Sequence, residues 1–517
     1  MHPYSKFGTG NKRTLLDGPS SEGKSARQTL LRFFDAYYSA NQMTLAVLGK
    51  ESLSQLQSTV DGMFAAVPNR GTGSRPSEKW LGKVKPFFNN QPLQAYNIVP
   101  VQDLRSVAIA WPLSYETPDE KKAFLAAKPF TYIGSLLGHE GPGSLLSYLK
   151  GKNWANSLGV AAATNTDDFT IFDVEIDVTP EGLANRFKVL TALFSYLELI
   201  RKKGIPSYLP AELSDLSDLG WRFQDKREPG NLVPSLAANM QEYAPEAVIS
   251  GPTRLQLYNE TLVGRVLDVM RPSPVDYSAS TPMVWSTAKE FAGKADKKEK
   301  WYGTPYQASG KGQEGVENLA SQAKEWCEPP VIPALRLPGP NPFVPRDLSV
   351  IKPKGRVIKA GEKVEAPASV LVFPTTAGWK VRHKLDDIFA QPKVVCYFEL
   401  VSPVAYESPR TVAALKLFEL SLNEKLNEYA YDAQMAGLGY SLDFTTRGVR
   451  LSFGGFGDKM PDFIEKVAGA VATYIPSDPV EFERLRDVVR RDLSSYDTQQ
   501  PYQHAMSNAA VASEDPR

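Results

Sequence analysis

His139 and Glu140 place an imidazole next to a carboxylate, a pair from which a zinc peptidase site could be built. In one class of zinc peptidases, an H-E-x-x-H helix supplies two histidine ligands four residues apart and a glutamate that acts as the base. Gly143 stands where the second histidine would be, and Pro142 with the neighbouring glycines disfavours a helix. The sequence therefore predicts a packed turn here and no local zinc site.

The other imidazoles offer no zinc helix either. The chain has four histidines, and none of them begins an H-E-x-x-H or an inverted H-x-x-E-H sequence. His2 precedes Pro-Tyr-Ser-Lys, His383 precedes Lys-Leu-Asp-Asp, and His504 precedes Ala-Met-Ser-Asn. We therefore predict no catalytic residue and no metal ligand in this chain. Ligands brought together from distant segments are the alternative that spacing leaves open.

Composition narrows the class of protein. The 517 residues are 42% hydrophobic and 23% charged, which is typical of a globular chain of two or three domains. Because 59 basic residues balance 58 acidic ones, the net charge is +1, and no overall field favours nucleic acid or an anionic membrane. No apolar run approaches the roughly 20 residues that a membrane span needs.

The cysteines and the first residues indicate the compartment. Cys327 and Cys396 are the only cysteines, so no disulfide framework is expected and a reducing compartment fits. Residues 1–8 have neither the apolar core of a signal peptide nor the Arg-rich pattern of a transit peptide. We therefore expect a cytoplasmic protein.

The elements around His139 are a glycine-rich turn and the helix that follows it. Ser144 can cap that helix, and Gly151 suits its C-terminal end. Three leucines at helical spacing form its apolar stripe, namely Leu145, Leu146 and Leu149.

A strand, a turn and an amphipathic helix recur three times along the chain. The predicted strands cover residues 43–49, 169–178 and 449–453. The first strand is followed by a helix with Leu53, Leu56 and Val60 on its apolar face. The other two helices follow a Thr179 cap and an Asp458 cap. The recurrence predicts duplicated α+β domains, although an α+β chain can also give such units by chance.

Alternating side chains support two of these strands. Phe172, Val174 and Ile176 share one face of the second strand, and the intervening acidic residues share the other. A β-hairpin with the third strand is also predicted, because apolar residues alternate over 440–444 and a turn follows over 446–448.

Further segments complete the outline. Residues 71–77 are predicted to be a connector, and prolines over 328–345 predict a semi-rigid strap without helix or strand. We also expect a helical pair over 213–270 and a solvated lysine run over 294–300. A further strand over 394–400 and a helix with a stripe from Leu415 to Tyr429 follow the strap.

Ordered motifs along almost the whole chain resemble the insulysin/pitrilysin (M16) family of zinc metallopeptidases. They lie at residues 2–12, 37–49, 100–105, 132–154, 299–304, 337–343, 402–406, 421–430 and 436–441. The resemblance covers the end of the family's first domain, the second domain and most of the third.

The resemblance implies a fold and a set of domains. Such enzymes have four homologous α+β domains, each an antiparallel sheet packed with helices, which form two half-shells around a peptide. By this resemblance, residues 1–75 are the end of the first, catalytic-type domain and 80–320 the second domain. Residues 321–345 are the proline-rich linker, and 346–517 are an incomplete third domain.

The resemblance also implies where zinc would be. The family holds zinc with an inverted H-x-x-E-H helix and a later glutamate, all upstream of the position matched by residues 2–7. We therefore expect a chain that lacks the catalytic motif, needs no cofactor of its own and does not cleave peptides alone, although its family uses zinc.

The second domain of the family has a surface that grips the amino-terminal end of a peptide by pairing with a strand edge. The residues that match this substrate-binding surface by position are Gly134, Gly138, His139, Glu140 and Leu158. Three positions depart from it, because Ser135 replaces a histidine and Val160 and Ala162 replace a glycine and a glutamine. Glu140 could meet the amino terminus of a peptide or could be a solvated turn carboxylate.

Two functions follow from the resemblance. One is an incomplete M16 metallopeptidase chain, and the other is a noncatalytic homologue that serves as a peptide-binding or scaffold subunit. An unrelated peptide-binding α+β protein is a third alternative. The expected partners are peptides and other M16 chains in homo- or hetero-oligomers, because faces such as that of Leu53, Leu56 and Val60 should be exposed. A genomic H-x-x-E-H helix in frame upstream of Met1 would favour the first function.

Overall fold

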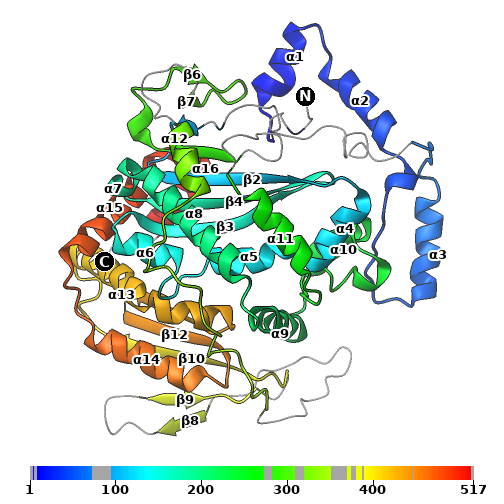
Figure 1. Ribbon diagram of the computed structural model, residues 1–517. Coiled ribbons are helices and arrows are strands. Elements are labelled where there is room, and N and C mark those ends of the chain that lie inside the picture. The colour runs from blue at the N-terminus through cyan, green and yellow to red at the C-terminus, as the bar shows by residue number, and fades with distance from the viewer. Residues whose placement is uncertain are drawn as a thin grey trace. The chain divides into compact units, whose positions relative to one another are not determined.

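A computed structural model provides the structure of the chain (Figure 1). It describes residues 4, 8–72, 93, 95–272, 282–308, 319–350, 370–373, 380–386, 389–445 and 447–513. His2, most of the predicted connector over 71–77 and Thr446 of the predicted hairpin turn lie outside these residues.

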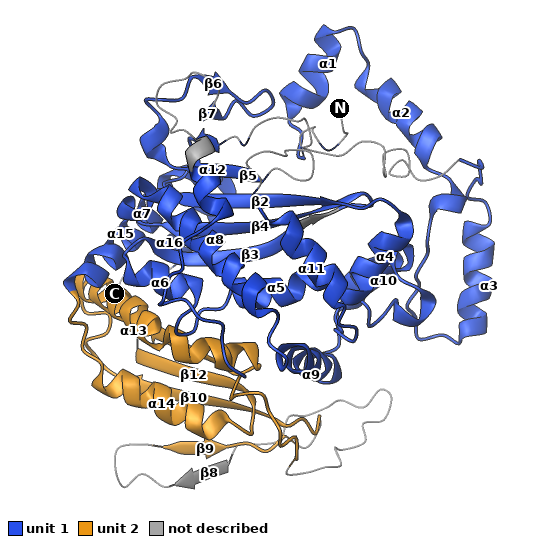
Figure 2. Cartoon of the chain, viewed as in Figure 1, with its two compact units in different colours: residues 1–340, 479–517 blue, residues 341–478 orange. Residues whose placement is uncertain are grey.

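The chain folds into two compact units (Figure 2). Unit 1 contains residues 1–340 and 479–517, and unit 2 contains residues 341–478. The domain bounds predicted from the family resemblance are not tested by this division into two units, and they stay predictions.

Unit 1 is built on a seven-stranded sheet with the strand order β3-β4-β2-β5-β1-β7-β6. Its strands are β1 (Ala95–Ile98), β2 (Ser106–Ser114), β3 (Ala155–Asn165), β4 (Phe169–Val178), β5 (Met283–Thr287), β6 (Lys297–Lys298) and β7 (Pro305–Ala308). The pair β1–β5 is parallel and the other neighbours are antiparallel. With the helices that pack on it, this sheet confirms the predicted α+β class.

The strand β4 has the predicted bounds and faces. Phe172, Val174 and Ile176 are buried against helices, whereas Glu175 is exposed on the opposite face. Helices α5 (Pro129–Leu137), α8 (Arg186–Lys203) and α11 (Glu260–Val269) cover the apolar face (Figure 1). Their buried side chains form one continuous core with those of β2 and β4.

Other helices of unit 1 surround this core. They are α4 (Pro118–Ala127), α6 (Leu145–Gly151), α7 (Pro180–Ala184), α9 (Leu209–Arg222), α10 (Pro229–Glu242) and α12 (Leu319–Cys327). Thr179 caps α7 as predicted, since its hydroxyl accepts the Gly182 N–H at 2.9 Å. The predicted helix is broken at Asn185, between α7 and α8.

The predicted helical pair over 213–270 is wrong, because the structure has the three helices α9, α10 and α11 there. Pro229 occupies the first turn of α10, a position that proline suits because its missing N–H would have no partner within the helix there. Asn259 caps α11 by accepting the Leu262 N–H at 3.1 Å.

The N-terminal part of unit 1 contains short helices and one failed strand prediction. The helices are α1 (Gly18–Ser21), α2 (Ala26–Tyr37) and α3 (Leu53–Phe64), and residues 43–49 do not form a strand. A strand needs a partner, and this segment lies instead against α10, where the Thr44 hydroxyl donates to the Ala237 carbonyl at 2.7 Å.

Unit 2 has its own three-stranded antiparallel sheet in the order β10-β12-β11. The strands are β10 (Lys393–Val401), β11 (Gly439–Thr445) and β12 (Gly448–Phe456), and α13 (Pro409–Met435) and α14 (Met460–Thr473) pack with them. A separate pair joins β8 (Val370–Phe373) to β9 (Val381–His383). The hairpin β11–β12 and the strand and helix predicted after the strap are confirmed.

The predicted Asp458 cap is wrong. The helix α14 begins at Met460 without a side-chain cap, because the Asp458 carboxylate accepts the backbone N–H groups of Arg346 and Asp347. Asp458 thereby binds the residues directly after the strap. The strap contains neither helix nor strand over 328–345, as predicted. The chain then returns to unit 1 as α15 (Pro479–Ser495) and α16 (Pro501–Ser513). The lysines over 294–300 are exposed, as predicted.

Candidate functional site

The strand β3 forms one edge of the sheet of unit 1. Within the described part of the chain, β4 is the one strand that pairs with β3. Residues 159, 161 and 162 are exposed along it, whereas Leu158 is 8% exposed and Val160 is half-buried. An edge strand presents backbone N–H and C=O groups to which another extended chain can bind.

Two predicted site glycines lie on the helix beside this edge. A Cβ atom at Gly134 would lie 3.8 Å from Val160 Cγ1, and one at Gly138 would lie 3.6 Å from Val160 Cγ2. The C-terminal half of α5 therefore runs against β3 (Figure 1). Because glycine has no side chain, this end of the helix packs closely on Val160 of the strand. The structure thus places Gly134 and Gly138 next to β3, the strand that carries Leu158.

His139 and Glu140 occupy the turn after α5, and both are half-buried. His139 Nδ1 accepts the N–H of Gly141 at 3.0 Å, so this imidazole organises the turn, as the packed-turn interpretation requires. Among the residues described, no three His, Cys, Asp or Glu side chains come together in a way that could hold a metal ion. The described residues therefore do not fit a zinc centre, and no catalytic step is assigned to one.

The same turn is held by the strap. Gly143 has φ +83°, a left-handed conformation that favours glycine. Its carbonyl accepts the N–H of Arg336 at 2.9 Å, and the Arg336 Nε donates to the Pro142 carbonyl at 3.3 Å. Ser144 then caps α6, as predicted, by accepting the Ser147 N–H at 3.1 Å.

The beginning of β3 carries a β-bulge at Asn156. Ala155 is opposite Val178 and Ser157 is opposite Asp177, so Asn156 is the extra residue of the pair. The Asn156 amide donates to the Asp177 carboxylate, and its oxygen accepts from Arg484 Nη1 at 3.1 Å.

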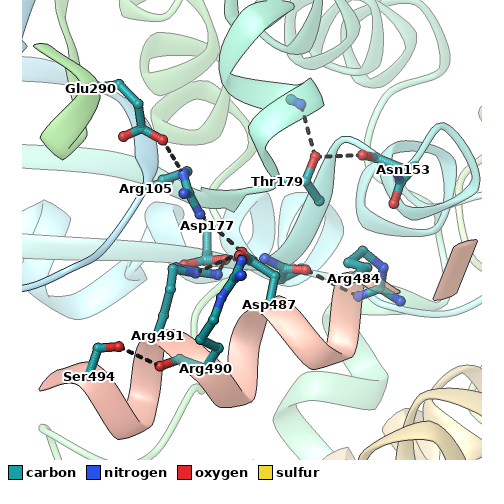
Figure 3. Close-up of polar contacts among 12 residues, drawn as sticks. Arg105, Asn153, Asp177, Thr179, Glu290, Arg484, Asp487, Arg490, Arg491 and Ser494 are labelled. Atoms are coloured by element: carbon teal, nitrogen blue, oxygen red, sulfur yellow. Dashed lines mark hydrogen bonds and ion pairs between the residues drawn. The ribbon is translucent and has the colours of Figure 1, made fainter. Parts of the chain in front are cut away.

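An ionic network of Asp487 and Arg491 binds α15 to the polar face of β4, and Arg484 is joined to it through Asn156. Arg491 lies 3.5 Å from Asp177 and donates to Asp487 at 3.1 Å, and Asp487 accepts from Arg105 at 3.0 Å. Arg105 also binds Glu290 (Figure 3). Two arginines of α15 are buried here, Arg484 at 9% and Arg491 at 8% exposed, whereas Arg105 is partly exposed.

Burial by itself would raise the pKa of Asp487. The hydrogen bond from Arg490 and the charges of Arg105 and Arg491 outweigh burial and lower this pKa below its ordinary value. The carboxylate is therefore held in its charged form between the cations.

The sequence did not indicate that Asn156 and Arg484 belong together. The spacing of Asp487 and Arg491 is typical of an ion pair on a helix, but it does not identify the strand that the helix meets. Arg484 and Asn156 are 328 residues apart, and this separation leaves no local signal.

Comparisons with known proteins identify the family. Residues 25–209 match the model described as the peptidase M16 inactive domain, and residues 221–517 match the middle or third domain of peptidase M16. The chain is 35% identical over 98% of its length to the insulin-degrading enzyme of Homo sapiens, of which it covers 46%. It is 31% identical over 99% of its length to insulin-degrading enzyme-like 1, peroxisomal, of Arabidopsis thaliana, of which it covers 49%.

A solved structure shows the same fold. The crystal structure of pitrilysin matches with a TM-score of 0.66 and 22% identity, over 96% of this chain and 49% of that one. The chain thus spans about half the length of the curated relatives that it matches. The two family models and the shared fold show that this chain belongs to the peptidase M16 family, among its insulysin-like members.

Proposed function

We propose that this chain supplies the peptide-anchoring part of an insulysin-like peptidase and binds extended peptides along the β3 edge. The observation that carries the proposal is the open edge of β3 beside the glycines of α5. A peptide strand that adds to β3 would gain backbone hydrogen bonds along residues 157–162. Its side chains would meet the small residues Gly159, Ala161 and Ala162, which leave room for bulky groups.

We also propose that the charge of Glu140 makes this edge prefer the amino-terminal end of a peptide. Gly138, His139 and Glu140 follow α5 directly, at the side of the sheet where β3 lies. A carboxylate in this turn would attract the α-ammonium group of a bound peptide. Replacement by glutamine would keep the shape of Glu140 and remove that charge.

We propose further that the chain does not cleave peptides alone and needs no zinc. None of its four histidines begins an H-x-x-E-H sequence. The test is a cleavage assay on a quenched peptide with added zinc and with a chelator. We expect no cleavage in either, and chelator-sensitive cleavage would contradict the proposal.

The binding proposal is tested with the isolated insulin B chain, labelled with fluorescein, because a relative is named an insulin-degrading enzyme. The readout is fluorescence anisotropy with the full chain. Ala162 lies in the second irregularity of β3, between Ala161 and Thr164, where proline is tolerated in a strand. Ala162→Pro removes one backbone donor, and Ala162→Thr is the matched control that keeps it.

We expect Ala162→Pro to weaken binding by about fivefold to tenfold, as expected for the loss of one net hydrogen bond, and Ala162→Thr to leave it unchanged. A B chain N-methylated along its backbone should not bind. Equal affinity of both variants and of the N-methylated peptide would contradict strand addition.

A role as a scaffold subunit is the second candidate function. Apolar side chains of α2 and α3 are exposed, among them Leu30 (68%), Leu53 (85%) and Met63 (71%). A surface of this kind favours a partner chain, and we propose another M16 chain or a second copy. We propose the cytoplasm as the compartment, which imaging of a tagged chain would test. Separately, none of the helices in the described residues could span a membrane.

A further inference from the structure

We propose that Arg484 of α15 is a positioning residue for the β3 edge, because it holds the Asn156 bulge that sets which side chains of β3 face α5. This inference rests on the proposed function of the edge, but its structural part can be tested separately. It assigns a role to a helix that lies more than 300 residues further along the chain than the strand it controls.

The bulge determines the orientation of the rest of β3. Side chains of a strand alternate between its two faces, so one extra residue reverses the alternation after it. Ala155 is buried in the core before the bulge, and Leu158 is buried in the same core after it. Without the extra residue, Leu158 and Val160 would face away from α5 and the Gly159 position would face toward it.

The Asn156 side chain is held from two directions. Its amide nitrogen donates to Asp177 on β4, and its oxygen accepts from Arg484 on α15. Asp177 is itself paired with Arg491, which lies about two turns further along α15 than Arg484, on the same side of the helix. Both partners of the bulge are thus bound to the same helix.

The helix is fixed in turn to the neighbouring strand. Asp487 accepts from Arg105, which precedes β2, and the Arg105 carbonyl accepts the N–H of Val178 at 3.0 Å. On the other side, the Thr179 hydroxyl donates to the Asn153 carbonyl at 2.6 Å and fixes the turn before β3. The beginning of β3 therefore depends on α15 for its conformation, whereas the turn before it has local support.

The test compares Arg484→Gln with Arg486→Gln in the full chain. Arg486 lies on the same helix, is 58% exposed and pairs with Glu483 within the helix, so it is a matched control. The first readout is amide hydrogen exchange over residues 155–162, and the second is the anisotropy titration with the labelled insulin B chain. Arg484→Lys tests whether a cation with a different geometry restores the contact.

We expect Arg484→Gln to accelerate exchange over 155–162 by about tenfold, as for the loss of a hydrogen bond to a charged group, and to weaken B-chain binding. Arg486→Gln should change neither, and Arg484→Lys should be intermediate. Unchanged exchange over 155–162 in Arg484→Gln would overturn the inference, whether or not the wild-type chain binds the B chain.

A double-mutant cycle keeps the test informative if Arg484→Gln loosens α15 as a whole. Asn156→Ala removes the same contact from the strand side. If Arg484 acts through Asn156, the double variant exchanges no faster over 157–162 than the stronger single variant. Effects that multiply would mean that Arg484 acts only on α15, and would overturn the inference. Failure of the proposed function would appear differently, as absence of B-chain binding by the wild-type chain.

Discussion

Gly182, in the short helix α7, lies directly against the backbone carbonyl of Trp154. A Cβ atom on Gly182 would overlap the carbonyl oxygen of Trp154. The backbone on both sides is fixed, since the Trp154 oxygen also accepts the N–H of Thr179 at 3.2 Å. The segment that leads into β3 can therefore approach α7 only because residue 182 has no side chain.

Replacing Gly182 by alanine should consequently destabilise unit 1, by about 1–3 kcal/mol in the free energy of unfolding, as for overpacking of a core. Gly264→Ala is the matched control, because Gly264 lies within α11 and a Cβ there meets nothing within 4 Å. That control should be neutral or stabilising, since alanine is favoured over glycine in helices. Urea titration followed by circular dichroism measures both, and a Gly182→Ala midpoint equal to that of the wild type would contradict the packing described.

The ionic network around Asp487 should make the docking of α15 sensitive to acid. Because the folded-state pKa of Asp487 is lowered below 3.8, its contribution to stability is complete above that value and is lost as the pH falls through the lowered pKa. Arg105, Arg490 and Arg491 face the carboxylate, and these cations keep their charge throughout. Between pH 7 and pH 5 we expect no change from this group.

Asp487→Asn tests this dependence. It should lower the free energy of unfolding at pH 7 by about 1–3 kcal/mol, since guanidinium groups are left without their charged partner. We expect the wild type to lose hydrogen-exchange protection of α15 below about pH 4, and this loss should be smaller in Asp487→Asn. Hydrogen exchange of α15 across this pH range is the measurement, and identical profiles for the two chains would count against the network.

The exposed apolar side chains of α2 and α3 should make the chain associate. Leu53 is exposed, as predicted for this face, whereas Leu56 and Val60 are half-buried. Light scattering should show species larger than a monomer, and the triple change Leu30→Lys, Leu53→Lys and Met63→Lys should shift the chain toward monomer. A monodisperse wild-type monomer at micromolar concentration would show that this surface needs no partner.

Helices and strands that are determined by residues close together in the sequence could be predicted from local patterns. The alternation along β4 and the Thr179-Pro180 cap gave the strand its observed bounds, and Ser144 with its three leucines gave α6. The hairpin β11–β12 followed from alternation around a glycine turn. In each case the hydrogen bonds or apolar contacts that form the element are nearly local.

Elements that depend on distant partners could not be predicted in this way. Residues 43–49 have the composition of a strand, but pairing is decided by what lies beside them, and the structure places Thr44 against α10. Asp458 looked like a cap, yet it binds backbone groups 111 and 112 residues away. Arg105 and Asp487 are separated by 382 residues, so no spacing rule connects them.

The candidate site also has parts that could be predicted from the sequence and parts that could not. Gly134, Gly138 and Leu158 were predicted through the family resemblance, and the structure places the two glycines next to Val160 of β3. Their role in binding a peptide stays a prediction. The bulge at Asn156 was not foreseen, because a bulge is defined by the register of two strands rather than by the type of one residue.

The most direct test of the central claim is amide hydrogen exchange of the full chain with and without the isolated insulin B chain. If peptides add as a strand to β3, the exchange of residues 157–162 should slow by at least about tenfold at saturation, since new backbone hydrogen bonds protect these amides. Binding of the B chain with unchanged exchange along β3 would contradict peptide anchoring at this edge.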